Sequence, residues 1–229
     1  MSRFIYEIAR IIFMTHNNLP VKIKALFPFP ELRPAQKKSI EAGLFDRKNI
    51  LVCTPTGSGK TQVAEFAMLN YFFENLGKTM YVVPLKALAS EKFNDFKNKY
   101  EKIGLKVGMS IGDLDNEEPY LSNYDVIITT SEKLDSMIRH KLVWIHDVKL
   151  LIIDEIHLLN DSTRGPTLEM VITMLRKLIP KMQIIGLSAT IGNPSDLADW
   201  LNAKLVLDNF RPCPLKEGIY FDGKLEFYD

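Results

Sequence analysis

Residues 49–61 read NILVCTPTGSGKT, and this stretch decides the fold of the chain. Its first part is a short apolar run with the length and branching of a buried strand. Its second part is a glycine-containing loop, and a segment of helical periodicity begins where the loop ends, at Lys60. A strand, a GxGKT loop and a helix in this order are the context that a phosphate-binding loop requires. The stretch therefore predicts an α/β protein that binds a nucleoside phosphate.

The residue types of the loop fit phosphate chemistry. Glycines let the backbone wrap around an anion, so that N–H groups and the helix N-terminus point at it. Lys60 would reach the β- and γ-phosphates of ATP, and Thr61 would offer its hydroxyl to Mg²⁺. The general pattern begins with glycine, whereas Thr54 stands first here, and a turn before an ordinary helix is the alternative. The expected ATP-binding residues are Thr54, Pro55, Thr56, Gly57, Ser58, Gly59, Lys60 and Thr61.

Composition narrows the class of protein. The 229 residues are 46% apolar and 25% charged, which is typical of a globular chain with one large domain. The net charge of +1 excludes a strongly basic protein that binds polyanions by bulk attraction, so any contact with nucleic acid must be local. The spacing of Cys53 and Cys213 argues against a disulfide scaffold and a zinc site. No run approaches the ~20 apolar residues that span a bilayer, so we expect a soluble, cytoplasmic protein without membrane association.

Short β-branched runs alternate with longer helical segments, which indicates βαβ units. We therefore predict a single α/β P-loop domain, with a mainly parallel sheet and helices on both faces. The expected strands cover residues 49–54, 79–83, 106–110, 125–129, 150–154, 183–188 and 204–207. The expected helices cover residues 34–43, 60–76, 85–103, 131–140, 166–179 and 194–201.

We divide the chain into an N-terminal extension at residues 1–30, a nucleotide-binding domain at 31–209 and an exit linker at 210–229. Met14 is an alternative start, and residues 1–13 would otherwise form a short amphipathic helix. Charge is uneven along the domain, since residues 85–106 are rich in lysine and residues 113–125 are acidic. We interpret both segments as solvated surface, because charged side chains are mostly exposed.

A second motif follows the expected strand at residues 150–154. There an apolar run delivers two adjacent carboxylates, Asp154 and Glu155. Open α/β sheets bind ligands at the carboxyl ends of their strands. In a P-loop protein the first acid suits Mg²⁺ through water, and the second suits polarisation of an attacking water. Alone the pair would be ordinary turn or cap chemistry, but with the loop it predicts catalytic roles for Glu155 and Lys60 and a metal-orienting role for Asp154.

The loop, the Asp-Glu-Ile-His box at residues 154–157 and Ser188-Ala189-Thr190 together resemble the first RecA-like domain of superfamily two helicases, over nearly the whole chain. Several further stretches resemble the superkiller-like branch, especially archaeal DNA-repair helicases related to the helicase domain of polymerase theta. These stretches are residues 32–36, 83–89, 112–113, 130–135, 164–169 and 211–212.

The resemblance implies roles for residues on the nucleotide side. Gln36 resembles the glutamine that reads the adenine edge, because its amide can pair a donor and an acceptor at once; a solvated surface glutamine is the alternative. His157, Ser188 and Thr190 resemble elements that relay the nucleotide state to the nucleic acid. Local polar satisfaction is the alternative for these three.

The resemblance also implies contacts with nucleic acid. Lys86 occupies the position of a basic residue that contacts the nucleic-acid backbone. Thr130 and Ser131 offer hydroxyls and helix amides to phosphate, although they equally suit a helix start. Arg164 belongs to a branch-specific motif near the nucleic-acid path.

The resemblance finally implies a partner. No stretch resembles the arginine-bearing motif of a second RecA-like domain, and an arginine finger is worth about 10³–10⁵ in rate. We therefore expect a fragment or a truncated reading frame that binds ATP and Mg²⁺ and hydrolyses ATP very slowly without a second RecA-like domain, in cis or in trans. In the whole motor it would act on single-stranded or forked nucleic acid, and the branch resemblance favours DNA over RNA and 3′ to 5′ polarity. The rivals are a catalytically silent nucleic-acid-binding or regulatory module and a different P-loop ATPase.

Overall fold

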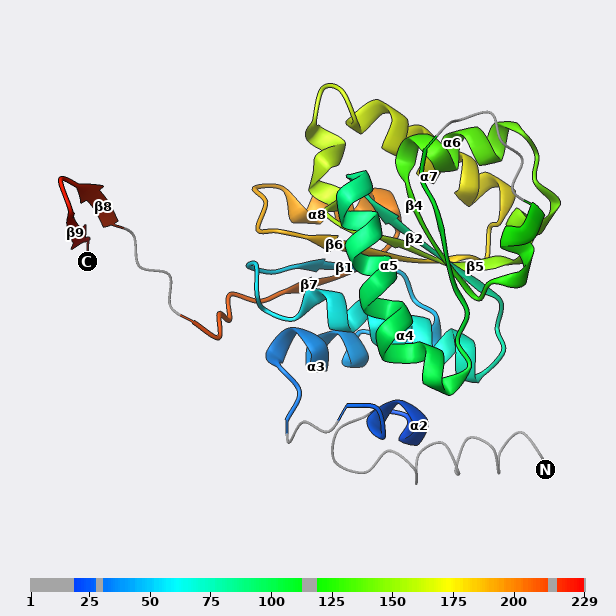
Figure 1. Cartoon of the computed structure of the whole chain (residues 1–229), viewed down its shortest axis with the longest axis horizontal. Helices are drawn as coiled ribbons and strands as arrows, with labels where there is room; N and C mark the ends of the chain where they lie inside the picture. The colour runs from blue at the N-terminus through cyan, green and yellow to red at the C-terminus, as the bar shows by residue number, and fades with distance from the viewer. Residues whose placement is uncertain (1–18, 28–30, 113–118, 214–217, 229) are drawn as a thin grey trace.

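The computed structural model describes residues 19–27, 31–112, 119–213 and 218–228 (Figure 1). The predicted amphipathic helix at residues 1–13, the alternative start at Met14 and the acidic residues 113–118 lie outside these ranges. The described part of the chain contains no helix with the length and apolarity needed to cross a membrane.

A seven-stranded parallel sheet forms the centre of the molecule, in the order β3-β4-β2-β5-β6-β1-β7. The alternation of strands and helices therefore predicted the fold class correctly. β1, β4 and β6 are buried along their whole length, and β2 and β5 at all but one position, as expected for the central part of a parallel sheet covered on both faces. The strands are β1 (Ile50–Cys53), β2 (Lys78–Val83), β3 (Val107–Ser110), β4 (Val126–Thr130), β5 (Val148–Ile153), β6 (Gln183–Ser188) and β7 (Lys204–Leu207).

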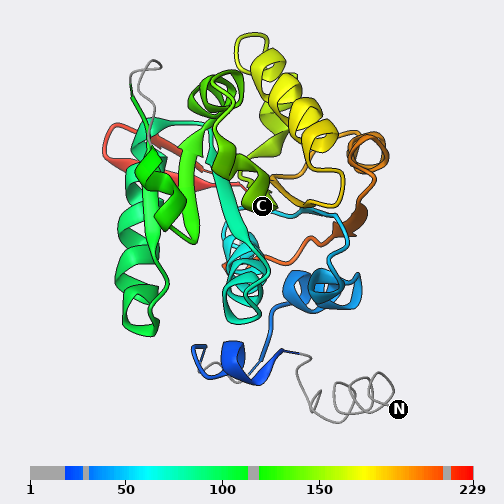
Figure 2. The same cartoon turned by 90° about the vertical axis from the view of Figure 1, so that its right-hand side faces the viewer.

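Helices cover both faces of this sheet (Figures 1 and 2). One hydrophobic cluster joins alternate strand residues to α3 (Pro34–Glu41), α4 (Lys60–Phe73) and α5 (Lys86–Tyr100). The other cluster joins the remaining strand residues to α6 (Ser131–Arg139), α7 (Gly165–Leu178) and α8 (Pro194–Leu201). Successive side chains of a strand point to opposite faces, so the central strands β1, β2, β4, β5 and β6 each contribute to both clusters. The predicted covering of both faces is confirmed.

Several helices are shorter than the periodicity predicts, because glycine or a left-handed residue ends them. The segment predicted as a helix at residues 60–76 ends at Phe73, since Asn75 (φ 49°) and Gly77 (φ 128°) have positive φ. The predicted helix at 85–103 ends at Tyr100 and continues as a 3₁₀ turn that Gly104 terminates at φ 87°. The 3₁₀ turns are η1 (Leu44–Asp46), η2 (Glu101–Ile103), η3 (Pro119–Asn123), η4 (Val143–Asp147) and η5 (Ile156–Asn160).

One helix and two strands were not predicted. A short helix, α2 (Val21–Lys24), packs on α4, and Phe27 after it meets Phe66 edge to face at 5.1 Å. Residues 19–27 thus contribute to the core. Near the C-terminus, β8 (Gly218–Phe221) and β9 (Lys224–Phe227) form an antiparallel hairpin that stands apart from the sheet in Figure 1.

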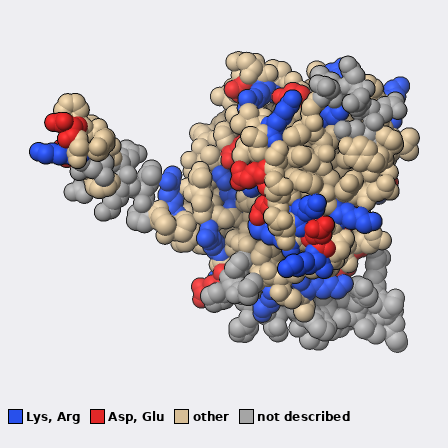
Figure 3. Space-filling model, viewed as in Figure 1, with Lys and Arg blue, Asp and Glu red and all other residues tan. Residues whose placement is uncertain are grey.

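The lysine-rich segment at residues 85–106 lies largely on α5. Its charged side chains are mostly exposed, and Lys99 pairs with Asp95 at 2.8 Å. Figure 3 shows blue and red side chains intermixed on the face that α5 covers. This segment is therefore solvated surface of mixed charge, as its composition indicated.

Candidate nucleotide-binding site

The two predicted motifs meet at the carboxyl edge of the sheet. The phosphate-loop residues follow β1, and Asp154 follows β5, with β6 lying between these two strands. β6 ends at Ser188, whose carbonyl oxygen accepts a hydrogen bond from Thr54 N at 3.2 Å. Asp154 N donates to Val82 O at 2.8 Å. Backbone hydrogen bonds to neighbouring strands thus fix the start of each motif. Both motifs lie at the carboxyl ends of the strands, with β6 between them.

The loop between β1 and α4 is curled and closed by its own hydrogen bonds. Gly57 and Gly59 have φ angles of 82° and 98°, the left-handed region that favours glycine. Thr54 Oγ1 and Ser58 Oγ lie 2.7 Å apart, and both side chains are buried. Lys60 Nζ donates to Thr54 O at 3.2 Å, across the mouth of the loop. The lysine amine therefore lies where the loop backbone would face an anion.

Arg33 and Gln36, at the start of α3, pack against the glycines of the loop. A Cβ added at Gly59 would lie 2.7 Å from Gln36 Nε2 and 3.2 Å from Arg33 Cδ, so these side chains would have to shift, and the φ of 98° also favours glycine. Arg33 Nη1 donates to Gly57 O at 2.6 Å. Arg33, the N-cap residue of α3, thus bonds directly to the glycine turn.

Gln36 is buried, with 1% of its surface exposed. Its Oε1 accepts from Arg33 N at 2.8 Å, and its Nε2 donates to Gln62 Oε1 at 2.8 Å. The alternative of a solvated surface glutamine is therefore wrong. Each amide atom keeps one further bonding capacity, so a role toward adenine remains a prediction.

Asp154 and Glu155 leave β5 at the turn before η5. Tyr81 Oη, on β2, donates to Asp154 Oδ2 at 3.0 Å, and Glu155 N donates to Asp154 Oδ1 at 3.1 Å. Burial raises the pKa of Tyr81 well above its usual range, and the charge of Asp154 adds to this effect. Glu155 has φ 52°, an unusual conformation for a residue with a side chain that costs about 1–3 kcal/mol. Such strain is commonly found at functional sites.

The three predicted coupling residues lie close to these acids but differ in exposure. His157 Nδ1 lies 3.4 Å from Glu155 Oε2 without forming a hydrogen bond. Ser188 is buried next to Cys53: burial raises the pKa of the Cys53 thiol, and a hydrogen bond with Ser188 opposes this rise. Thr190 is exposed. Local polar satisfaction therefore stays an alternative for His157, which faces the Glu155 carboxylate, and for Ser188, which bonds to Cys53.

The donor set fits Mg²⁺ and a nucleotide. Mg²⁺ usually keeps several waters and takes one or two protein oxygens, and Thr61 and Asp154 offer a hydroxyl and a carboxylate. Thr61 Oγ1 accepts a hydrogen bond from Lys92 Nζ of α5 at 3.4 Å. Lys60 and Lys92 thus bring two positive charges beside the loop. This is the charge environment that a polyphosphate requires.

The residues expected to contact nucleic acid differ in their exposure to solvent. Lys86 is exposed at the first position of α5, and Arg164 is partly exposed at the N-cap of α7. Thr130 and Ser131 each have 5% exposure, and Thr130 Oγ1 caps α6 by accepting from Lys133 N at 3.5 Å. The helix-start interpretation of these two residues is therefore confirmed. Contact of their hydroxyls with phosphate stays a prediction.

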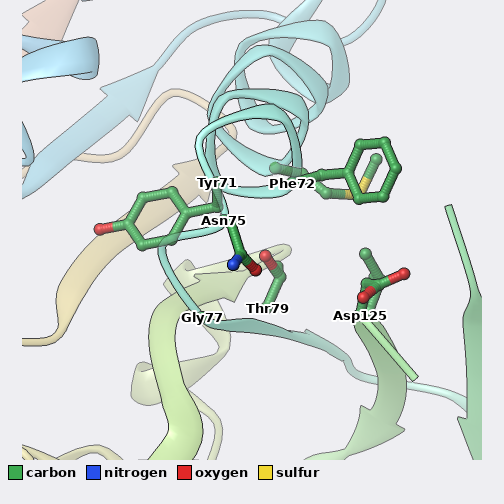
Figure 4. A pocket seen from close by; sticks show the side chains of 8 residues that line it. Tyr71, Phe72, Asn75, Gly77, Thr79 and Asp125 are labelled. Atoms are coloured by element: carbon green, nitrogen blue, oxygen red, sulfur yellow. The ribbon is translucent and has the colours of Figure 1, made fainter. Parts of the chain in front are cut away.

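A small cavity of about 80 Å³ lies at the opposite, amino edge of the sheet (Figure 4). Its lining includes Tyr71 and Phe72 of α4, with Asn75, Thr79 and Asp125 near the starts of β2 and β4. A cavity of this size holds a few waters, since one water needs roughly 10–15 Å³ on this measure. It is therefore too small for a nucleotide.

Four contacts at the site were missed by the sequence analysis, namely those of Arg33, Gln62, Tyr81 and Lys92. Arg33 lies at residues 32–36, one of the stretches that resemble the superkiller-like branch, but that resemblance implied no role for it. Tyr81 belongs to an apolar strand and Lys92 to a mixed-charge helix surface, so no local pattern marks either one. Their roles follow from which strands and helices become neighbours.

Comparison with known proteins finds one family and several relatives that resemble this chain. Residues 33–197 match the DEAD/DEAH box helicase family. The chain is 56% identical over 203 residues to the ATP-dependent DNA helicase Hel308 of Methanococcus vannielii, covering 86% of this chain and 27% of the relative. It is 54% identical over 207 residues to the Hel308 of Methanocaldococcus jannaschii, covering 88% of this chain and 17% of the relative.

A solved structure has a similar fold. The DUF1998 helicase MrfA, in a crystal structure bound to DNA, matches with a TM-score of 0.67 at 23% identity, covering 85% of this chain and 30% of that chain. At this identity the match bears on the fold alone. The chain thus spans less than a third of the length of each of these relatives.

Proposed function

The chain belongs to the DEAD/DEAH box helicase family, with Hel308-type relatives, and on this premise we propose that it is the ATP-binding domain of an ATP-dependent DNA helicase. One observation carries the proposal. The GxGKT loop and the Asp-Glu pair lie at the carboxyl ends of β1 and β5, on either side of β6 and its Ser-Ala-Thr element. Open α/β sheets bind their ligands at such an edge.

In this proposal the loop residues 54–61 bind the phosphates of ATP. Lys60 would exchange its bond with Thr54 O for phosphate oxygens. Thr61 and Asp154 would hold Mg²⁺, which neutralises charge on the phosphates when bound. Tyr81 keeps Asp154 Oδ2 oriented. Gln36 would pair with adenine, at the cost of its bond to Gln62.

Glu155 is the proposed general base, since a carboxylate beside the metal-orienting acid can take a proton from the attacking water. His157, Ser188 and Thr190 would sense the nucleotide state. The contacts of His157 Nδ1 with Glu155 Oε2 at 3.4 Å and of Ser188 O with Thr54 N at 3.2 Å support this role, because each residue touches a group proposed to contact ATP or the attacking water.

The DNA strand would pass Lys86, the start of α6 at Thr130 and Ser131, and Arg164. A second RecA-like domain, in cis or in trans, would supply the arginines that complete the ATP site, and movement would then be 3′ to 5′. Duplexes with a 3′ or a 5′ tail, given to a protein in which the two domains are joined, test this polarity. Faster unwinding of the 5′-tailed duplex would contradict it.

The direct test of the ATP site is Lys60→Ala in this chain. We expect calorimetry to show loss of ATP binding, because two charge-assisted bonds to phosphate oxygens would be lost at about 1.5–3 kcal/mol each. Lys177→Ala is the matched control, since Lys177 is an exposed lysine in the last turn of α7. Equal ATP affinity of wild type and Lys60→Ala would overturn the assignment of the loop.

A further inference from the structure

An open groove with a volume of about 590 Å³ lies at the amino edge of β1, β6 and β7. Four cationic side chains line it, those of Arg47, Lys48, Lys181 and Lys204, and Asp199 is the only acid in its lining among the described residues. The lining therefore carries three positive charges in excess. Since the whole chain has a net charge of +1, this is a strong local concentration of positive charge.

These four cations have no ion-pair or side-chain hydrogen-bond partner in the part of the chain that the structure describes. All four are exposed. The stem of Lys48 passes Gly43, where an added Cβ would lie 2.6 Å from Lys48 Cδ. The charged groups are thus free to meet an anion from solvent.

Capping of α8 does not explain this charge. Cations often gather at helix C-termini, where the last four carbonyl groups lack partners within the helix. Here those carbonyls already have partners. Ala203 N and Asn202 N donate to Ala198 O and Asp199 O, Arg176 Nη1 donates to Trp200 O, and Asn49 Nδ2 donates to Leu201 O.

The same hydrogen bonds make the groove a preformed surface. Asn49 joins β6 to the end of α8, because its Oδ1 accepts from Ile184 N at 2.8 Å while its Nδ2 donates to Leu201 O at 3.1 Å. Arg47 and Asn202 hold left-handed backbone conformations at φ 60° and 49°, at the two turns that border the groove. A preformed surface loses less entropy when a ligand binds.

We propose that this groove binds the phosphodiester backbone of duplex nucleic acid. Four separate cations around an open volume of this size suit an extended polyanion better than one small anion. The lining in the described part of the chain contains no aromatic side chain on which an unstacked base could lie. Single-strand binding usually relies on such stacking. Contact with the backbone of a stacked duplex is therefore the favoured mode.

This groove is separate from the candidate nucleotide site. β1 spans four residues between the two, so they lie at opposite edges of the sheet, roughly 13 Å apart at a rise of about 3.3 Å per residue. Duplex binding at the groove needs no ATP and no hydrolysis. Failure of this proposal would leave the ATP site untouched, and failure of the ATP site would leave this proposal standing.

The test is fluorescence anisotropy of a labelled blunt duplex with the whole chain, without nucleotide. A groove variant carries Arg47→Gln, Lys48→Gln, Lys181→Gln and Lys204→Gln. A control variant with the same net charge carries Lys24→Gln, Lys37→Gln, Lys102→Gln and Lys106→Gln, all at exposed positions outside the groove lining. We expect the groove variant to bind about tenfold or more weakly, with a salt exponent reduced by about 3–4, because each phosphate contact contributes about 0.9.

A second variant is expected to bind more tightly, a result that misfolding could not produce. Asp199→Asn removes the acid from the groove and should tighten duplex binding by about threefold, since less charge repels the phosphates. Equal weakening in the groove and control variants would overturn the proposal, because net charge alone would then explain binding. A loss of single-strand binding in the groove variant as large as its loss of duplex binding, or equal competition by polyglutamate, would also overturn it.

Discussion

The side chain of Tyr81 on β2 is fully buried, and its Oη donates a hydrogen bond to Asp154 Oδ2 at 3.0 Å. At the scale of single residues, Tyr81→Phe removes this bond while keeping the ring packed against Phe96 at 5.3 Å. Partners that orient a metal ligand are typically worth about 10–100-fold in metal affinity. We expect ATP binding in the presence of Mg²⁺ to weaken by about that factor, and binding without Mg²⁺ to stay unchanged.

Titration of ATP with and without Mg²⁺ checks this prediction. Tyr71→Phe is the control, because Tyr71 is a buried tyrosine on α4 that lines the cavity at the opposite edge. An unchanged Mg²⁺ dependence in Tyr81→Phe would show that Asp154 needs no orientation from β2.

Glu65 on α4 is a buried acid outside both motifs, with 3% exposure, and it accepts hydrogen bonds from Tyr100 Oη and Lys99 Nζ. Burial raises the pKa of Glu65, although the bond from Tyr100 and the charge of Lys99 oppose the rise. A raised folded-state pKa means that the carboxyl favours its neutral form. Its contribution to stability is then complete below the unfolded value of about 4.3 and is lost as pH rises through the folded value.

Glu65→Gln should therefore be more favourable at pH 7 than at pH 4, relative to wild type. The amide keeps an acceptor for Tyr100 and has no charge to bury. Guanidinium denaturation at both pH values measures the difference in free energy of unfolding, with exposed Glu91→Gln on α5 as the control. A Glu65→Gln difference that does not grow with pH would contradict the raised pKa.

At the scale of elements, the sequence predicted strands and long helices well and short segments poorly. Periodicity identifies α7 because fourteen residues repeat a pattern, whereas α2 has only four residues and forms by packing on α4. The sequence analysis predicts a linker where the hairpin β8–β9 forms, because prolines precede it at 212 and 214 and glycines lie within it at 218 and 223, a composition typical of linkers. Element ends were misplaced where a positive φ at Asn75 or Gly104 stops a helix that its side chains would continue.

The packing of α2 gives a prediction about elements. Phe27 has 9% exposure and contacts Phe66 of α4, so Phe27→Ala should cost about 3 kcal/mol. Thermal unfolding would then shift by roughly 6–12 °C for a chain of this length. Phe210→Ala, at a phenylalanine with 40% exposure, should change stability by less than about 0.5 kcal/mol. Equal shifts for both variants would mean that residues 19–27 add nothing to the core.

At the scale of the whole molecule, the candidate site could be predicted because its motifs are contiguous in sequence. The loop at residues 54–61 and the acids at 154–155 each follow a strand, and parallel strands bring their carboxyl ends to one edge. The supporting contacts could not be predicted. Tyr81 meets Asp154 because β2 and β5 are neighbours, and Arg33 meets Gly57 because α3 packs against α4.

The most direct test of the central claim is ATP turnover of this chain, measured beside ATP affinity, with and without single-stranded DNA. We predict MgATP binding with negligible turnover, because no stretch resembles the arginine-bearing motif that is worth about 10³–10⁵ in rate. Robust turnover stimulated by DNA would contradict this account, since the chain would then complete its own catalytic site. Absence of MgATP binding would contradict the assignment of the ATP site itself. It would favour a catalytically silent module that keeps the helicase fold.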